Sequence, residues 1–228
     1  MKRHLAVIPA RGGSKRLPRK NIIGFLGKPI IAYTIEAAKA SGVFDRVIIS
    51  TEDKEIADVA RRYGGDVDER DAELATDAAT IKQVCLELLD RLEQAGEKYD
   101  TLSVLYATAP LRNASDIRAT HALLSDGCDF AMAVTEFHQP VHQALILKPV
   151  HNIEPVFPEL ISKRASDVDR YAAGNGSTYC VKVSAFKAKP GFYGAPLRGH
   201  IMPRERSIDI DTIEDFRLAE YYAKQQQS

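Results

Sequence analysis

Short apolar runs alternate along the chain with segments whose apolar residues recur every three or four positions. The runs at residues 4–8, 46–50 and 102–106 have the length and composition of strands that are buried on both faces. Amphipathic helical spacing is found at residues 29–41, 53–63, 80–95 and 115–125. Later in the chain we expect strands at 130–135 and 178–183 and a closing helix at 212–224.

This alternation predicts a three-layer α/β sandwich, in which helices cover both faces of a mostly parallel sheet. The rhythm breaks between about residues 136 and 174, which contain four prolines and few periodic runs. We therefore expect one domain over residues 1–228, with this insertion as a lid, a substrate wall or a subunit contact. Ligands of such sheets bind beyond the carboxyl ends of the strands, so the loops after residues 8 and 106 are expected to meet in one crevice.

Charge is balanced over the whole chain but not along it. The 228 residues include 31 Lys or Arg and 31 Asp or Glu, a formal net charge of zero, which argues against a basic coat for nucleic acid. Residues 1–35, however, contain eight Lys or Arg and no acidic residue. An anionic ligand is therefore expected near this segment.

Cysteine usage and the N-terminal segment indicate the compartment. Three widely spaced cysteines without a CxxC pair predict reduced, mostly buried thiols. The apolar run after Arg3 stops at Pro9, which is too short for a signal peptide or a membrane span. We expect a cytoplasmic protein with no membrane partner.

The segment Ala-Arg-Gly-Gly-Ser-Lys-Arg-Leu-Pro-Arg-Lys-Asn, residues 10–21, directly follows the first strand. Gly12 and Gly13 allow backbone conformations that bring N–H groups close to a ligand. Positive charge stands at five positions of the segment: Arg11, Lys15, Arg16, Arg19 and Lys20. Guanidinium groups pair with phosphate oxygens and lysines act as point charges, so the loop is predicted to hold a polyphosphate. It matches neither the GxGxxG pattern of dinucleotide folds nor the P-loop.

Two carboxylates near the C-terminus are the second candidate for chemistry. Residues two apart in an extended segment point to the same side, so Asp209 and Asp211 can face one ligand together. Such a pair suits Mg²⁺, which binds one or two carboxylates together with phosphate oxygens and waters. The alternative is that the pair caps the helix expected after Thr212.

The residues at 8–15, Ile-Pro-Ala-Arg-Gly-Gly-Ser-Lys, and at 17–21, Leu-Pro-Arg-Lys-Asn, closely resemble the signature of the acylneuraminate cytidylyltransferases. These enzymes are the CMP-sialic acid synthetases and their pseudaminic and legionaminic acid relatives. The resemblance extends to the final helix and implies a Rossmann-like fold of the nucleotide-diphospho-sugar transferase type. It implies that CMP is transferred from CTP to an acidic sugar, that Asp209 and Asp211 hold Mg²⁺, and that the chain is a homodimer.

The resemblance also implies roles for individual residues. The catalytic residues would be Arg11, Lys15, Lys20 and Asp211. The nucleotide would be bound by Ala10, Arg11, Gly12, Gly13, Ser14, Lys20, Asn21, Thr80, Tyr106 and Thr108. The sugar would be bound by Arg164, Tyr171, Asn175 and Tyr179. Thr80 has a second interpretation as the cap of the following helix, and Arg164 has one as a surface residue.

Tyr106 bears on which sugar is used. Sialic acid synthetases typically carry glutamine at this position, whereas Tyr-Ala-Thr-Ala-Pro at residues 106–110 looks more like the pseudaminic acid branch. Three alternatives remain at this point: a sugar such as Kdo, the use of GTP in place of CTP, and a non-catalytic nucleotide-binding module. Both carboxylates are kept, which argues against the binding module, because a pure binder needs no charged metal pair.

Overall fold

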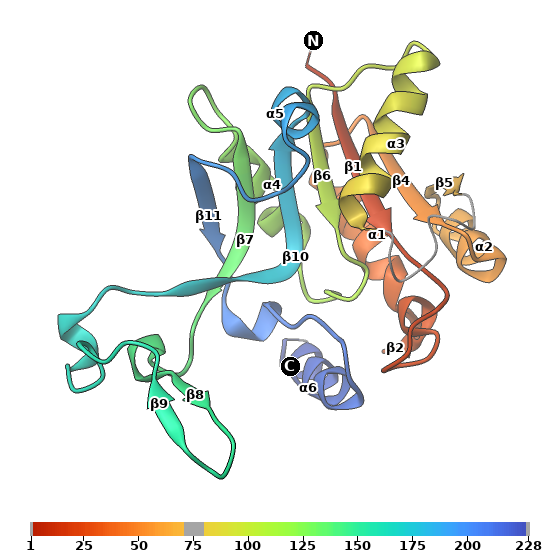
Figure 1. Ribbon diagram of the computed structural model, residues 1–228. Helices are drawn as coiled ribbons and strands as arrows, with labels where there is room; N and C mark the ends of the chain where they lie inside the picture. The colour runs from red at the N-terminus through yellow and green to blue at the C-terminus, as the bar shows by residue number, and fades with distance from the viewer. Residues whose placement is uncertain (1, 71–79, 227–228) are drawn as a thin grey trace.

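The computed structural model describes residues 2–70 and 80–226, and within them a seven-stranded sheet forms the centre of the molecule (Figure 1). Its strands are β1 (His4–Pro9), β4 (Arg46–Thr51), β5 (Asp66–Glu69), β6 (Thr101–Leu105), β7 (Phe130–Glu136), β10 (Ala172–Lys182) and β11 (Leu197–Ile201). They lie in the order β11-β7-β10-β6-β1-β4-β5, and β10 is antiparallel to both of its neighbours. The other pairs are parallel, so the prediction of a mostly parallel sheet is confirmed.

Helices cover both faces of the sheet because the buried strands carry apolar residues on both sides. In β1, Leu5 and Val7 join one core cluster, and Ala6 and Ile8 join the cluster on the opposite face. The first cluster is covered by α3 (Ile81–Gln94) and α5 (Val183–Ala188). The second is covered by α1 (Ile30–Ser41), α2 (Lys54–Arg62) and α4 (Ala114–Ala122). The predicted three-layer α/β fold is therefore confirmed.

The last helix, α6 (Ile213–Gln225), packs next to the basic loop. It packs on the short hairpin of β2 (Gly24–Phe25) and β3 (Lys28–Pro29), where the rings of Phe25 and Phe216 meet edge to face with centroids 5.6 Å apart. A 3₁₀ turn, η1 (Lys20–Ile22), leads from the basic loop into this hairpin. The β2–β3 hairpin and the C-terminal helix α6 are thus packed against each other beside the loop.

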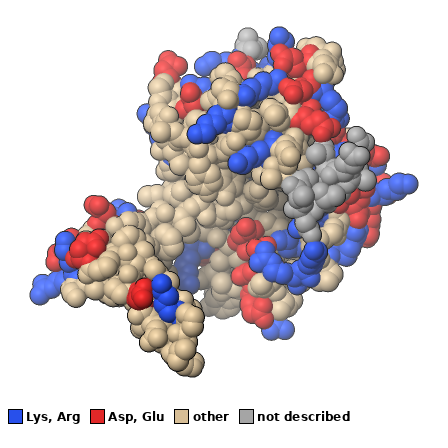
Figure 2. Space-filling view, viewed as in Figure 1, with Lys and Arg blue, Asp and Glu red and all other residues tan. Residues whose placement is uncertain are grey.

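Residues 137–171 form an arm that projects from the body between β7 and β10 (Figure 1). The arm contains a small hairpin of β8 (Leu145–Leu147) and β9 (Ile153–Pro155) and two 3₁₀ turns, η3 (Val141–Gln143) and η4 (Ala165–Asp167). It falls inside the insertion predicted at about 136–174. Many of its apolar side chains are exposed, and the hairpin surface that faces the viewer in Figure 2 is largely uncharged.

Among the elements that the pattern of apolar residues did not predict are the edge strands β5 and β11 and the helix α5, besides the short hairpins β2–β3 and β8–β9. The sequence of β5, Asp-Val-Asp-Glu, has one apolar residue, and β11 is largely exposed. Both lie at sheet edges, where a strand is held by backbone hydrogen bonds to one neighbour and needs no apolar run. Helix α5 is too short for its periodicity to be read. Among the residues described, no helix is long and apolar enough to cross a membrane.

Candidate active site

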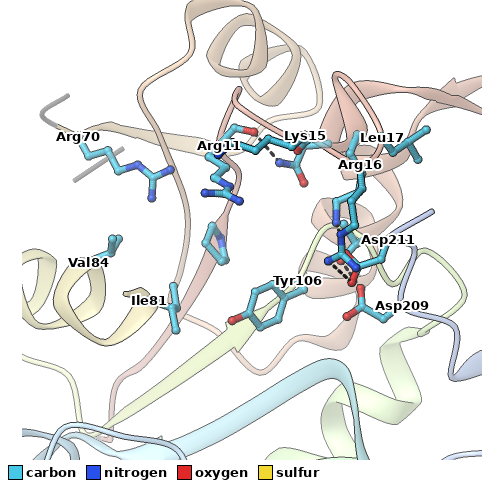
Figure 3. A pocket seen from close by; sticks show the side chains of 15 residues that line it. Arg11, Lys15, Arg16, Leu17, Arg70, Ile81, Val84, Tyr106, Asp209 and Asp211 are labelled. Atoms are coloured by element: carbon cyan, nitrogen blue, oxygen red, sulfur yellow. Dashed lines mark hydrogen bonds and ion pairs between the residues drawn. The ribbon is translucent and has the colours of Figure 1, made fainter. Parts of the chain in front are cut away.

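A cavity of about 510 Å³ opens beyond the carboxyl ends of β1 and β6. Figure 3 shows the basic loop along one side and the two carboxylates at one end. Its lining residues are Pro9, Arg11, Ser14, Lys15, Arg16, Leu17, Lys20, Asn21, Arg70, Ile81, Val84, Tyr106, Thr108, Asp209 and Asp211. The loops after β1 and β6 therefore meet in one crevice, as the strand order of an α/β sheet requires.

Asp211 forms ion pairs with two cationic side chains of the basic loop. Lys20 Nζ and Arg16 Nη2 each lie 2.6 Å from a different oxygen of its carboxylate. Burial by itself would raise the pKa of Asp211, but Lys20 and Arg16 outweigh burial and hold that pKa below its ordinary value. The buried Asn21 donates from Nδ2 to the carbonyl oxygen of Arg11 at 2.9 Å, which fixes the turn of the loop.

Asp209 has a different environment from Asp211. It accepts a hydrogen bond from Thr108 Oγ1 at 2.5 Å, and Ile210 N donates to the Thr108 carbonyl oxygen at 2.8 Å. Burial, together with the nearby charge of Asp211, raises the pKa of Asp209. A dication beside the pair would oppose both effects.

The donor set fits magnesium, since two carboxylates line the cavity opposite a loop suited to phosphate, and Mg²⁺ takes its remaining ligands from phosphate oxygens and water. Within the described part of the chain no three His, Cys, Asp or Glu side chains gather as an all-protein metal cage.

The two residues that follow β4 hold the basic loop from its other side. Glu52 accepts a hydrogen bond from Gly12 N at 2.8 Å and pairs with the Arg70 guanidinium at 2.7 Å. Asp53 takes two hydrogen bonds from Arg19, which lies in the left-handed region at φ 55°. Asp53 also caps α2 through Ile56 N, and Arg19 holds the pKa of Asp53 below its ordinary value. Of the five cations in the loop, Arg19 is thus used to anchor it.

The close approach of the Asp53 side chain to the loop explains why residue 12 is glycine. A Cβ atom on Gly12 would lie 2.3 Å from Asp53 Oδ2 and 3.0 Å from its Cγ. The loop and the end of β4 touch through backbone and carboxylate here, with no room for a side chain between them.

The cavity has two chemically different ends. Arg70, Ile81 and Val84 lie at one end in Figure 3, and Arg16, Asp209 and Asp211 lie at the other. Arg70 is 9% exposed, and its guanidinium is oriented by two hydrogen bonds to Glu52 Oε2. One end is therefore apolar with a fixed guanidinium, and the other is rich in charge.

Aromatic rings continue from the cavity toward the surface. Tyr106 and Tyr179 meet edge to face with centroids 6.0 Å apart, and the Tyr193 ring lies 6.3 Å beyond Tyr179. Burial raises the pKa of Tyr106 to about 12, so its hydroxyl keeps its proton at neutral pH. On the side next to Asp209, the cavity wall is thus formed by the Tyr106 ring, whose protonated hydroxyl can donate a hydrogen bond.

The predicted nucleotide-binding, catalytic and metal-binding residues divide into two groups. Those that line the cavity are Arg11, Ser14, Lys15, Lys20, Asn21, Tyr106, Thr108, Asp209 and Asp211. Ala10 is buried in the core and donates its N–H to Ser50 O, Gly12 N donates to Glu52, and Gly13 is exposed. Thr80 caps α3 through Gln83, as the second interpretation proposed. The segment at 74–79, which resembles a nucleotide-contacting stretch, lies outside the residues described.

Of the predicted sugar residues, Tyr179 lies next to the cavity through Tyr106. Asn175 is buried on β10 and donates to Ser207 Oγ at 3.1 Å. Arg164 and Tyr171 lie in the arm, where Arg164 is exposed and Tyr171 stacks on Phe157 with centroids 6.4 Å apart. A single chain therefore does not gather all four on the cavity.

Sequence reasoning missed Glu52, Asp53 and Arg70 as parts of the site. The first two directly follow β4, one residue beyond the strand predicted at residues 46–50. That position was itself a usable signal, because loops at the carboxyl ends of parallel strands share one crevice. Arg70 follows β5, whose acidic sequence did not read as a strand.

Comparison with known proteins agrees with this geometry. A family model described as cytidylyltransferase matches residues 5–145. Pseudaminic acid cytidylyltransferase of Campylobacter jejuni subsp. jejuni serotype O:2 is 36% identical, with 97% of each chain covered. CMP-N,N'-diacetyllegionaminic acid synthase of Legionella pneumophila is 32% identical over 96% of this chain and 95% of its own. N-acylneuraminate cytidylyltransferase of Escherichia coli O18:K1:H7 is 32% identical over 94% of this chain and 51% of its own.

Solved structures show the same fold at low identity. CMP:2-keto-3-deoxy-manno-octonic acid synthetase complexed with CTP superposes with a TM-score of 0.71 at 16% identity, with 99% of this chain and 100% of that chain covered. Given the family match over residues 5–145 and the relative that is 36% identical over nearly its full length, the protein belongs to the cytidylyltransferase family.

Proposed function

We propose that the protein transfers CMP from CTP to a nonulosonic acid of the pseudaminic acid type and releases pyrophosphate. Two relatives at 36% and 35% identity over nearly the whole chain are pseudaminic acid cytidylyltransferases. Tyr106, which departs from the glutamine expected in sialic acid synthetases, supports the same branch. The observation that carries the proposal is the cavity itself, where a cationic loop faces two carboxylates across a space of about 510 Å³.

The reaction is a displacement at phosphorus. The anomeric hydroxyl oxygen of the sugar acid bonds to the α-phosphorus of CTP, and the bond from that phosphorus to the bridging oxygen breaks as pyrophosphate leaves. Such a transfer depends on position and on neutralised charge more than on a covalent intermediate. Arg11, Lys15 and Lys20 line the cavity where they would offset the charge that grows on the leaving pyrophosphate.

The two carboxylates have a different role from the cationic side chains, because they would bind a metal ion. Asp209 and Asp211 would hold Mg²⁺, which when bound neutralises phosphate oxygens and lowers the pKa of a bound hydroxyl or water. With that cation bound, Asp211 would give up part of its pairing with Lys20 and Arg16, and these two side chains could then bind the phosphates.

The two ends of the cavity suggest how the substrates lie. We place the nucleobase between Ile81, Val84 and Arg70, because cytosine presents two adjacent acceptors, O2 and N3, to a guanidinium that Glu52 already orients. Uracil presents an N–H donor in place of N3, which would face the donors of Arg70. The sugar acid is placed beside Tyr106 and Tyr179, next to Asp209.

Pyrophosphate release tests the proposal when CTP, UTP and GTP are each paired with pseudaminic, legionaminic, sialic and Kdo acids. We expect turnover with CTP and a nonulosonic acid. Turnover only with Kdo or only with GTP would replace the proposed substrates, and binding of CTP without any pyrophosphate would leave a non-catalytic module.

The metal assignment is tested with Asp211→Asn, which keeps the size of the side chain and removes its charge. We expect turnover with excess Mg²⁺ to fall about 100-fold or more. Asp126→Asn is the matched control, because Asp126 is exposed in the turn before β7, at the other end of the sheet. Near-normal turnover of the Asp211 variant would refute the assignment.

We also propose that the arm joins two chains in a homodimer. Leu147 is 84% exposed and Ile153 is 56% exposed, an apolar surface that a second copy would cover. Light scattering coupled to size exclusion should show a dimer for the wild type and a monomer for Leu147→Asp. Asn152→Asp, on the same hairpin turn, is the control for added charge and should stay dimeric. A monomeric wild type would refute the proposal.

The compartment is part of the same proposal. The three cysteines are free and buried, as expected for a reducing compartment, and we place the reaction in the cytoplasm. Fractionation of cells that express the full chain would test this, and activity outside the cytoplasmic fraction would contradict it.

A further inference from the structure

An irregular stretch of β10 lies against the side chain of Asp209. The register of β10 against β7 shifts between Gly174 and Tyr179, and we call residues 175–178 the β10 bulge. Gly176 stands in it at φ +72° with its backbone against the Asp209 side chain. A Cβ atom there would lie 2.3 Å from Asp209 Oδ2 and 2.8 Å from its Cγ. One oxygen of Asp209 is thus bonded to Thr108 and the other rests on Gly176.

The bulge is held by its own side chains and by its neighbours. Asn175 Oδ1 accepts hydrogen bonds from Ser177 N at 3.1 Å and from Ser177 Oγ at 2.8 Å. The Asn175 amide nitrogen donates to Ser207 Oγ, which ties the bulge to the segment that leads into Asp209. Tyr106 N donates to the Ser177 carbonyl oxygen at 3.2 Å. Asn175 is therefore committed to this framework.

Arg112 completes the support. It is 2% exposed, and its Nη1 donates to the Ser177 carbonyl oxygen at 2.8 Å. Its Nε and Nη2 are buried with no hydrogen-bond partner among the residues described. Burial lowers the pKa of Arg112 to about 10, which still leaves it charged at neutral pH. Burying a cation with unpaired donors is costly, and such costs are concentrated at functional sites.

We propose that the β10 bulge, fixed by Arg112 and Asn175, is a positioning element that sets the Asp209 carboxylate for a divalent cation. The inference rests on the proposed function, because it assumes that Asp209 binds the cation together with CTP. It assigns Asn175 to positioning and not to direct contact with the sugar. Partners that orient a metal-binding carboxylate typically change metal affinity by about 10–100-fold when they are removed.

The test is Mn²⁺ binding in the presence of CTP and without sugar acid, measured by electron paramagnetic resonance of free Mn²⁺. Gly176→Ala should weaken Mn²⁺ binding about 10–100-fold, because the new methyl group displaces the carboxylate and strains its bond with Thr108. Gly127→Ala is the matched control: Gly127 has φ +77° and open space around its Cβ position, so the variant has the same backbone strain without the contact. It should bind Mn²⁺ like the wild type.

Asn175→Ala provides a second variant if Gly176→Ala does not fold. It adds no atoms and removes the bonds that close the bulge, so Mn²⁺ binding should weaken in the same direction. Folding is checked by circular dichroism. Wild-type Mn²⁺ affinity in a folded Gly176→Ala, or in Asn175→Ala where the first does not fold, would overturn the positioning role while the proposed function stands. A wild type that binds no Mn²⁺ with CTP would overturn both.

Discussion

The contact between Asp53 and Arg19 can be separated from the helix cap that the same carboxylate makes. Asp53→Asn keeps an oxygen that can accept from Ile56 N, because asparagine caps helices as well as aspartate does, and it removes the charge that pairs with Arg19. Asp53→Ala removes both interactions. Comparing the two variants isolates what the ion pair does for the basic loop.

The magnitudes follow from burial and geometry. Loss of the cap costs about 1 kcal/mol. The ion pair is partly exposed, with Arg19 39% and Asp53 20% accessible, so it contributes roughly 0.2–1 kcal/mol. Asp53→Ala should therefore lower the free energy of unfolding by about 1–2 kcal/mol and Tm by about 3–6 °C, whereas Asp53→Asn should lose less than about 1 kcal/mol.

Activity should respond to loss of the ion pair alone, and so equally in both variants. Arg19, at φ 55°, pairs with Asp53 and also with Glu55, and Gly12 packs against the Asp53 carboxylate. Loss of the Asp53 charge therefore weakens the anchoring of the loop, while Glu52 still accepts from Gly12 N. Both variants should raise KM for CTP by about tenfold, since an ångström of misplacement in a binding loop is enough for this. Scanning calorimetry gives Tm, and pyrophosphate release gives KM. An unchanged KM in Asp53→Asn would refute the idea that the pair braces the loop.

Two further predictions concern other parts of the molecule. Arg70→Met should raise KM for CTP and narrow the preference for CTP over UTP by about tenfold or more, because the oriented donors are lost; parallel pyrophosphate assays measure this, and an unchanged ratio would contradict it. His121 is partly buried beside His4 and Thr101 Oγ1, and this burial, with a smaller effect of His4, lowers its pKa to about 4. The unfolded chain takes up this proton near pH 6.5 and the folded chain does not, so stability is lost as the pH falls from about 6.5 toward 4, by about 2–3 kcal/mol at pH 4.5. His121→Gln should flatten this dependence in urea unfolding, and equal losses in both proteins would contradict the assignment.

The cavity also shows how far a local motif can be interpreted. The basic segment predicts an anion site on its own, because charge density and adjacent glycines are properties of neighbouring residues. Which cation of the segment anchors the loop and which faces the cavity is not a local property, however. Arg19 and Lys20 are adjacent in the chain, yet Arg19 pairs with Asp53 after β4 and Lys20 pairs with Asp211 before α6. Which cation faces the ligand depends on partners that are 34 and 191 residues away.

Asn175 and Thr80 show the same limit for single polar residues. Each is of a type that can bind a ligand or satisfy backbone groups, and sequence does not distinguish these roles. In the folded chain Thr80 caps α3 and Asn175 closes the β10 bulge. Side-chain partners that are distant in sequence, such as Ser207 for Asn175, decide the role.

The sequence by itself determined the layered α/β fold, the loop that faces the cavity and the carboxylate pair, because apolar periodicity, glycine and clustered charge act over a few residues. Only the tertiary structure showed that β5 and β11 form the edge strands of the sheet. It alone also showed that Glu52 and Asp53 anchor the basic loop, and that Gly176 and Arg112 support Asp209. These features depend on segments that come into contact only when the whole sheet has formed. Their energies come from geometry between distant residues, which no local pattern contains.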